Sequence, residues 1–255
     1  MIEFFSRTRL CLTVLFHMLN IVSNKVLDYR NFLYCIQNAG FDVLLINIIT
    51  SFFISLVLSL QIVKEFLYLD AAHLVSSILA LSFIRELSPV LTAIIIIGKV
   101  GSLFTSEIGT MVVTEQIDAL FILGINPVYY LIYPRFLALI VMFPLLNLFS
   151  LLTSFFSSAF ICFVLYNISP DFFFLNLFYS TIYSDLFKSL IKVFIFAFGV
   201  SIISCVWGIK TSGGSKGVGN STTSSVVTSL LFVFISNFFL SYVLFDNFLS
   251  VFSVI

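Results

Sequence analysis

Residues 136–164, FLALIVMFPLLNLFSLLTSFFSSAFICFV, decide the class of fold because this long stretch contains no charged residue. A transmembrane helix needs about 20 mainly apolar residues to cross roughly 30 Å of hydrocarbon. At about 1.5 Å per residue, this stretch would form a helix of about 44 Å. Such a helix must tilt, protrude from the bilayer or bend at Pro144. The stretch therefore predicts a membrane-spanning helix.

Four other stretches have the same apolar character, namely residues 41–63, 74–97, 186–207 and 226–245. The whole chain of 255 residues is 60% hydrophobic and only 9% charged, whereas a soluble domain carries about 25% charged residues. The sequence therefore predicts an all-α polytopic membrane protein with about five transmembrane helices, forming one domain over residues 1–255.

The charge balance excludes one large class of function. Twelve Lys and Arg residues are matched by twelve Asp and Glu residues. The chain therefore has no basic surface that could hold the phosphate backbone of a nucleic acid, and we expect no nucleic-acid partner.

The segment before the first predicted span, residues 1–38, mixes apolar residues with Arg7, Arg9, Lys25 and Arg30. This composition favours a helix or helix pair lying in the headgroup region, with a sixth span as the alternative. No removable targeting peptide is visible in this segment.

Basic residues also predict how the chain crosses the membrane. Lys99 and Arg135 flank the connection after the second span, and Lys210 and Lys216 lie in the connection after the fourth. By the positive-inside rule, these connections face the cytoplasm or stroma, and the C-terminus faces the opposite side.

Two adjacent charges, Arg85 and Glu86, lie inside the second predicted span. A charge at membrane depth costs at least about 2.5 kcal/mol. Neighbouring helix positions diverge by about 100°, so each charge needs its own partner on another helix or in water. Two interpretations stay open. In the first, the pair belongs to a buried ion network that fixes packing; in the second, it belongs to the polar wall of a transport pathway made adaptable by Pro89.

Small residues follow at helical spacing, at Gly98, Gly101, Thr105 and Gly109. Small side chains at this period let membrane helices approach closely, so we expect these four residues at a helix packing face. Lys99, Leu103 and Glu107 form a second stripe along the same segment.

Residues 113–124 predict a short helix outside the bilayer. Thr114 can cap its start, Glu115 and Asp118 suit its first turn, and Gly124 can end it. The acids and Gln116 face one way while apolar residues face another, which provides a small surface for a partner. An ordinary interfacial linker helix is the alternative.

No residues suited to catalysis, metal binding or cofactor binding are apparent. His17 and His73 have no second ligand at metal spacing, and the four cysteines lie far apart. The glycine-rich connection 208–225 lacks the spacing of a phosphate-binding loop. We therefore expect a non-enzymatic chain without a cofactor, driven by another chain or an ion gradient.

Residues 81–146 contain a series of ordered blocks: R-E-L-x-P at 85–89, G-K-V-G-S at 98–102, S-E-I-G-T-M at 106–111, T-E-Q-I-D-A-L at 114–120, then N-P at 126–127 and P-R at 134–135. This stretch closely resembles the MlaE-type (YrbE) permease family, the membrane subunits of lipid-transporting ABC transporters in bacteria and plastids. A weaker similarity covers residues 185–245. Lys99 stands where the family commonly has Arg, and Ser88 where Gly is usual.

The resemblance implies a permease subunit that moves phospholipid or another polar lipid between membranes and forms a homodimer. It implies an ABC ATPase subunit on the cytoplasmic or stromal side and an MCE-type lipid-binding protein on the other side. It also implies that Glu115, Gln116 and Asp118 lie on the coupling helix that docks into the ATPase. Arg85, Glu86 and Leu87 are then the candidates for the transport pathway.

Two other functions remain possible from the residues alone. An ion-coupled secondary transporter could use Arg85, Glu86 and Glu107, although no internal repeat is apparent. A membrane assembly protein would transport nothing. The 33 phenylalanines and 11 glycines are typical of an AT-rich genome. This bias favours a plastid-encoded protein of the inner envelope, with a bacterial inner membrane as the alternative.

Overall fold

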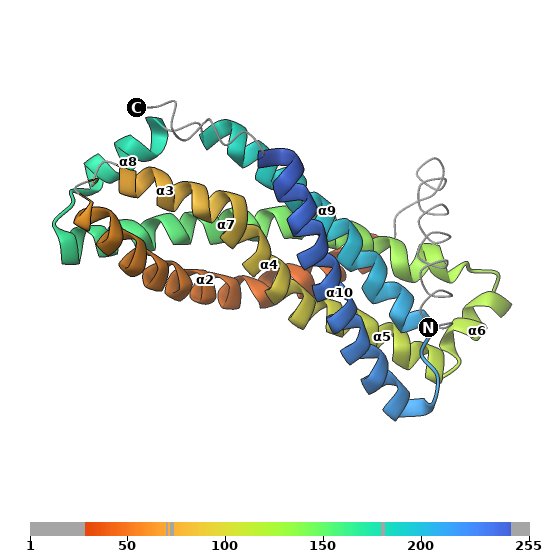
Figure 1. Ribbon diagram of the computed structural model, residues 1–255. Helices are drawn as coiled ribbons and strands as arrows, with labels where there is room; N and C mark the ends of the chain where they lie inside the picture. The colour runs from red at the N-terminus through yellow and green to blue at the C-terminus, as the bar shows by residue number, and fades with distance from the viewer. Residues whose placement is uncertain (1–28, 70, 72–73, 180–181, 246–255) are drawn as a thin grey trace. The chain divides into compact units, whose positions relative to one another are not determined.

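The structure is a computed structural model that describes residues 29–69, 71, 74–179 and 182–245 (Figure 1). Helices account for nearly all of these residues, and no strand occurs among them. The α-helices are α2 (Tyr29–Tyr68), α3 (Val75–Ser82), α4 (Ser88–Ile96), α5 (Ser102–Val113), α6 (Gln116–Ile122), α7 (Tyr133–Tyr166), α8 (Pro170–Tyr179), α9 (Ile182–Ile209) and α10 (Gly214–Phe245). The π-helical turns are η2 (Phe83–Leu87), η3 (Ile97–Gly101) and η4 (Val128–Ile132). The predicted all-α class is confirmed.

Within the described residues, five helical stretches are long and apolar enough to cross a membrane, as the sequence predicts. They are Tyr29–Tyr68, Val75–Val113, Val128–Tyr166, Tyr183–Ile209 and Gly214–Phe245. Each is longer than its predicted apolar stretch because the helix continues into more polar sequence at one or both ends. The third continues unbroken through Pro144.

The start of the first span differs from the prediction. Residues 29–38, assigned from the sequence to an interfacial segment, belong to α2 and are continuous with the spanning helix. Residues 29–68 contain no proline that would interrupt the backbone hydrogen bonds. The rest of the predicted interfacial segment, and the possible sixth span within it, lie outside the described residues.

The π-helical turn η2 has a cause in the sequence. Pro89 has no backbone N–H, so the carbonyl of Arg85 cannot receive its usual helical donor. The backbone N–H of Ser88 donates to the carbonyl of Phe83, five residues earlier. Proline thus produces a local π-bulge where the chain continues from α3 to α4.

The chain divides into two compact units, and α2, α4, α7, α9 and α10 contribute residues to both. Unit 1 contains the described residues 29–43, 93–143 and 195–234, and unit 2 contains residues 44–92, 144–194 and 235–245. In unit 1, Ile108, Ile132 and Cys205 form a buried apolar cluster. In unit 2, a larger apolar cluster joins residues of α2, α3, η2, α7 and α8.

Small polar side chains join the helices of unit 2. Ser51 Oγ lies 2.7 Å from Thr153 Oγ1, and Ser88 Oγ donates to Asn147 Oδ1 at 2.8 Å. Asn47 Nδ2 donates to the carbonyl of Leu146 at 2.8 Å. Such contacts suit helices in a membrane, where hydrophobic burial does not favour one helix neighbour over lipid.

Candidate functional site

Arg85 and Glu86 turn to different partners on other helices of unit 2. Arg85 Nε and Nη2 donate to Asp185 Oδ2 at 3.1 and 2.8 Å. Asp185 is almost fully buried, and the Arg85 guanidinium also lies 5.0 Å from the centre of the Phe245 ring. The prediction that the two adjacent charges need separate partners is confirmed.

Glu86 is held by polar side chains from α9 and α10. Lys192 Nζ lies 3.2 Å from each carboxylate oxygen. Asn237 Nδ2 donates to Oε2 at 2.8 Å, and Ser241 Oγ donates to Oε1 at 2.6 Å. The Glu86 side chain is nevertheless 45% exposed, whereas that of Lys192 is fully buried.

Lys192 also compensates for the break that Pro89 makes in the helix. Its Nζ donates to the carbonyl of Arg85 at 2.8 Å and to Ser241 Oγ at 2.8 Å. An ammonium group has three hydrogens to donate. Here they are directed to the Glu86 carboxylate, the Ser241 hydroxyl and the carbonyl that Pro89 leaves without a helical donor.

Arg85, Glu86, Asp185 and Lys192 form what we call the charged cluster. It contains two cations and two anions, so burial need not leave an uncompensated charge. Asp185 and Lys192 are not among the site residues predicted from the sequence. Lys192 is a charged residue inside the fourth apolar stretch, just as Arg85 is inside the second. This feature of the sequence could have identified Lys192 as a candidate. Leu87 instead packs against the apolar cluster of unit 2.

The short helix predicted over residues 113–124 exists as α6, but it starts differently. Thr114 does not cap the helix, because its Oγ1 donates back to the carbonyl of Thr110 in α5 at 2.9 Å. Glu115 takes the N-cap position with a left-handed backbone, φ 59°, and forms no side-chain cap. Because the Thr114 hydroxyl bonds to α5, it is not available to cap α6. The turn between the two helices is formed by the left-handed backbone of Glu115. The predicted first-turn position holds for Asp118 but not for Glu115.

The end of α6 is as predicted. Gly124 has φ 73°, a conformation that favours glycine. The N–H of Gly124 donates to Phe121, and that of Ile125 donates to Leu120 at 3.0 Å.

α6 combines acidic and apolar groups on an exposed surface. Glu115, Gln116 and Asp118 are all exposed. Ile117 packs against the buried cluster of unit 1, which anchors the helix. The apolar side chains that follow are exposed: Phe121 62%, Ile122 87% and Leu123 72%. An exposed apolar group beside charges is typical of a protein interaction surface.

The four small residues do not all have the same environment. Thr105 Oγ1 lies 2.9 Å from both the Ser204 carbonyl and Ser225 Oγ, where three helices meet. A Cβ on Gly109 would lie 2.9 Å from Thr211 Oγ1, and one on Gly101 would lie 4.0 Å from Val200. Among the described residues, a Cβ on Gly98 would have no neighbour within 4 Å. Close packing in this part of the chain therefore does not explain Gly98.

Glu107 and Arg135 form an ion pair in unit 1. Arg135 Nη2 lies 2.7 Å from Glu107 Oε2, and Nη1 donates to the carbonyl of Leu131 at 2.9 Å. Arg135 is 7% exposed, and its guanidinium lies 5.6 Å from the centre of the Phe104 ring. These contacts fix α7 against α5 within the unit.

Among the described residues, no group of three or more His, Cys, Asp or Glu side chains is placed to hold a metal ion. Cys35, Cys162 and Cys205 are buried free thiols. His17, His73 and Cys11 lie outside the described part of the chain.

Comparison with known proteins gives a consistent result. The sequence model of the family described as Permease MlaE matches residues 32–243. A protein of Pyropia yezoensis named probable ABC transporter permease protein ycf63 is 50% identical over 202 residues, covering 79% of this chain and 77% of its own. The probable ABC transporter permease protein slr1045 of Synechocystis is 44% identical over 229 residues, covering 90% and 87%. The Arabidopsis thaliana protein TRIGALACTOSYLDIACYLGLYCEROL 1, chloroplastic, is 40% identical over 228 residues, covering 88% of this chain and 63% of its own.

Proposed function

The chain belongs to the MlaE permease family and is a multi-pass membrane permease subunit, and we propose that it moves phospholipid or another polar lipid between membranes, driven by ATP hydrolysed on a separate ABC ATPase subunit. The lipid class follows the family resemblance. The ATPase partner follows from the relatives named ABC transporter permeases.

The observation that carries this proposal is the exposed surface of α6. Force from a separate ATPase must enter through a contact at the membrane surface. α6 joins the second and third candidate spans and presents Glu115, Gln116 and Asp118 beside exposed Phe121 and Ile122. We assign these three polar residues to ATPase coupling. The contact of Ile117 with the core of unit 1 provides a path from α6 to the spanning helices.

The charged cluster supports a role for Arg85 and Glu86 in the transport pathway. Glu86 remains 45% exposed although its carboxylate has several partners, so a polar group can reach it from outside. The adjacent π-bulge lets the backbone adjust without breaking the helix. Leu87, the next residue after Glu86, would contribute an apolar side chain to the same pathway.

We assign the remaining partners in the same way. The exposed apolar face of α10, which includes Leu231, Phe238 and Tyr242, is available to a second copy of the chain in a homodimer. An MCE-type lipid-binding protein on the side opposite α6 would receive or deliver the lipid. The chloroplast designation of the Arabidopsis relative supports the plastid inner envelope, and the Synechocystis relative supports a bacterial inner membrane as the alternative.

Purification of the full chain from its native membrane tests the proposal. A tagged chain extracted in mild detergent should retain an ABC ATPase in stoichiometric amount. Recovery without any ATPase, together with gradient-driven transport by the isolated chain, would instead establish an ion-coupled transporter. Recovery with neither an ATPase nor transport activity would establish an assembly protein.

A further inference from the structure

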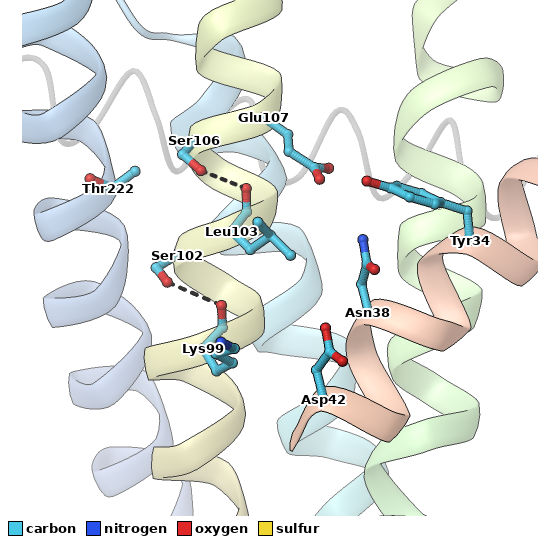
Figure 2. A pocket seen from close by; sticks show the side chains of 9 residues that line it. All are labelled: Tyr34, Asn38, Asp42, Lys99, Ser102, Leu103, Ser106, Glu107 and Thr222. Carbon is cyan, nitrogen blue, oxygen red and sulfur yellow. Dashed lines mark hydrogen bonds between the residues drawn. The ribbon is translucent and has the colours of Figure 1, made fainter. Parts of the chain in front are cut away.

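Two cavities in the described part of unit 1 differ in what lines them. The larger, of about 540 Å³, is lined mainly by polar side chains, with Tyr34, Asn38 and Asp42 on the α2 side of α5 and Ser102 on the α10 side (Figure 2). The smaller, of about 90 Å³, lies between α5, α6, η4 and α9, and all eight residues that line it are apolar. Because α6 contributes to its lining, the smaller cavity adjoins the surface that we assign to the ATPase.

The smaller cavity extends from a buried floor to an exposed rim. Its floor is formed by Ile108, Leu131 and Ile132, which are at most 5% exposed. Its rim includes Ile117 and Phe121, which lie one turn apart on the same face of α6. Phe121 is 62% exposed. The cavity is therefore accessible from outside the protein beside α6.

The position of this cavity along the chain separates it from the hydrocarbon of the membrane. Its residues lie between positions 108 and 132 and at position 209. The apolar stretches of the neighbouring spans are residues 74–97, 136–164 and 186–207. An acyl chain stays within the hydrocarbon region, so it is a poor candidate for the occupant. An occupant must come from the aqueous side.

The volume of the cavity indicates which kind of side chain fits. An apolar cavity of about 150 Å³ stays dry and binds a benzene molecule. At about 90 Å³, the cavity beside α6 is too small for an aromatic side chain but has room for the end of an aliphatic one. Its lining offers no polar side chain, so water would gain few hydrogen bonds there.

The acidic residues of α6 indicate the charge of the occupant's surroundings. Asp118 lies three residues before Phe121, a spacing that places two side chains next to each other on a helix surface. Among the described residues, neither Asp118 nor Glu115 forms an ion pair, and both are exposed. A basic group of a partner would complement these carboxylates, and an acidic group would be repelled.

We propose that an aliphatic side chain of the ABC ATPase inserts into this cavity, and that a basic residue next to it on the ATPase pairs with Asp118. The inference rests on the ATPase coupling proposed above and names the chemistry of the partner's surface. An anchor side chain in a well-packed pocket carries much of the binding energy of an interface. The inserted side chain would contact η4 as well as α6, and η4 continues into α7. Motion of the ATPase would then reach the third span directly.

Filling the cavity with a side chain of the permease itself tests the proposal. Val128 lines the cavity and is half-buried. Val128→Phe should occupy the space and lower the affinity for the ABC ATPase by about tenfold or more, since burial of one aliphatic side chain accounts for at least this factor. Titration of the detergent-solubilised chain with the ATPase that copurifies with it measures the affinity. Val164→Phe, the same substitution at an exposed position of α7 outside the cavity, should leave the affinity unchanged.

A second variant changes the polarity of the cavity without filling it. Threonine has nearly the shape of valine but carries a hydroxyl group, so Val128→Thr makes the lining less favourable for an aliphatic side chain. The affinity should fall by a smaller factor than in Val128→Phe. Thermal unfolding of the isolated chain should stay near that of the wild type, which shows that α6 is still in place. If Val128→Phe does not fold, Val128→Thr alone decides.

Two results would overturn the proposal. The first is an affinity for the ATPase that equals that of the wild type in the folded Val128 variants. The second is a change in the oligomeric state of the chain with the ATPase still bound, which would show that a second copy occupies the cavity.

The outcomes also separate this inference from the proposed function. If no ATPase copurifies with the wild-type chain, the ATPase-driven function fails and this inference fails with it. If the ATPase binds the wild type and the Val128 variants equally well, only the assignment of the cavity is overturned.

Discussion

Lys192 shows how a single buried cation can be accommodated within the membrane. Its side chain is fully buried and depends on Glu86 for its counter-charge. Glu86, by contrast, is partly exposed and has two further donors, Asn237 and Ser241. Lys192 therefore needs Glu86 as a counter-charge more than Glu86 needs Lys192.

This asymmetry predicts unequal effects of substitution. Glu86→Ala should destabilise the protein by about 3–5 kcal/mol, because it leaves a buried cation without its partner. Lys192→Met should cost less, because the Glu86 carboxylate retains donors and contact with solvent. The free energy of unfolding in detergent measures both effects.

The double variant supplies the control. Glu86→Ala with Lys192→Met should recover most of the stability lost in Glu86→Ala alone, since no unpaired charge remains. Lys64→Met, on an exposed residue of α2, should be nearly neutral. Strict additivity of the two cluster substitutions would show that the ion pair does not stabilise the fold.

The space around a helical glycine, and not its spacing along the sequence, decides whether a side chain fits there. A Cβ on Gly208 would lie 2.7 Å from Cβ of Ile108 and 3.1 Å from the backbone oxygen of Thr105. α9 and α5 can approach closely there only because a side chain is absent. Gly98 has open space around it in the same unit.

We therefore expect opposite effects from two alanine substitutions. Gly208→Ala should destabilise by about 1–3 kcal/mol, because the helices must separate or strain. Gly98→Ala should be neutral or stabilise by up to about 1 kcal/mol, because alanine favours the helix. The free energy of unfolding of both variants, measured under the same conditions, tests this expectation. A loss of stability in Gly98→Ala would indicate that Gly98 has a neighbour on another chain.

At the scale of the helix, α6 makes a prediction about coupling. Glu115→Lys with Asp118→Lys reverses two exposed charges at the surface assigned to the ATPase. Losing a desolvated charge pair at an interface costs about 2–5 kcal/mol, so affinity for the partner should fall by roughly thirty-fold or more. Retention of the ATPase on the purified chain measures this change.

The matched control is Asp171→Lys, which reverses an exposed acidic residue of α8. This variant should retain the ATPase fully. Because Glu115 and Asp118 are exposed, their reversal should leave the thermal stability of the membrane subunit near that of the wild type. Normal retention and transport in the double reversal would mean that α6 is not the docking element.

The periodicity of the sequence predicted where single helices lie and end, but it did not predict which side chains of different helices are in contact. The five spans and the end of α6 at Gly124 follow from hydropathy and glycine geometry. Tyr34, Asn38 and Asp42 have the same spacing as the stripe of Lys99, Leu103 and Glu107, yet spacing alone does not tell which helices face each other. The partners Asp185 and Lys192 were missed for this reason. Thr114 was misplaced because its hydroxyl can bond to either of two helices.

At the scale of the whole molecule, the described chain consists of spanning helices and short connections. Three ion pairs join charged groups of these spans, namely Arg85–Asp185 and Glu86–Lys192 of the charged cluster and Glu107–Arg135. This organisation suits a permease subunit that changes shape in response to a partner. The energy for transport would then enter through α6 and reach the lipid through the spanning helices.

Lipid transfer by the complex reconstituted in proteoliposomes tests most directly whether ATP hydrolysis on a partner subunit drives lipid transport through α6. Fluorescently labelled lipid should move only when the permease, the ATPase and hydrolysable ATP are all present. An ion gradient without ATP should have no effect, and the Glu115→Lys, Asp118→Lys variant should abolish the movement. Transfer by the permease alone under an ion gradient, or ATP-driven transfer that is unchanged in the double reversal, would contradict the account.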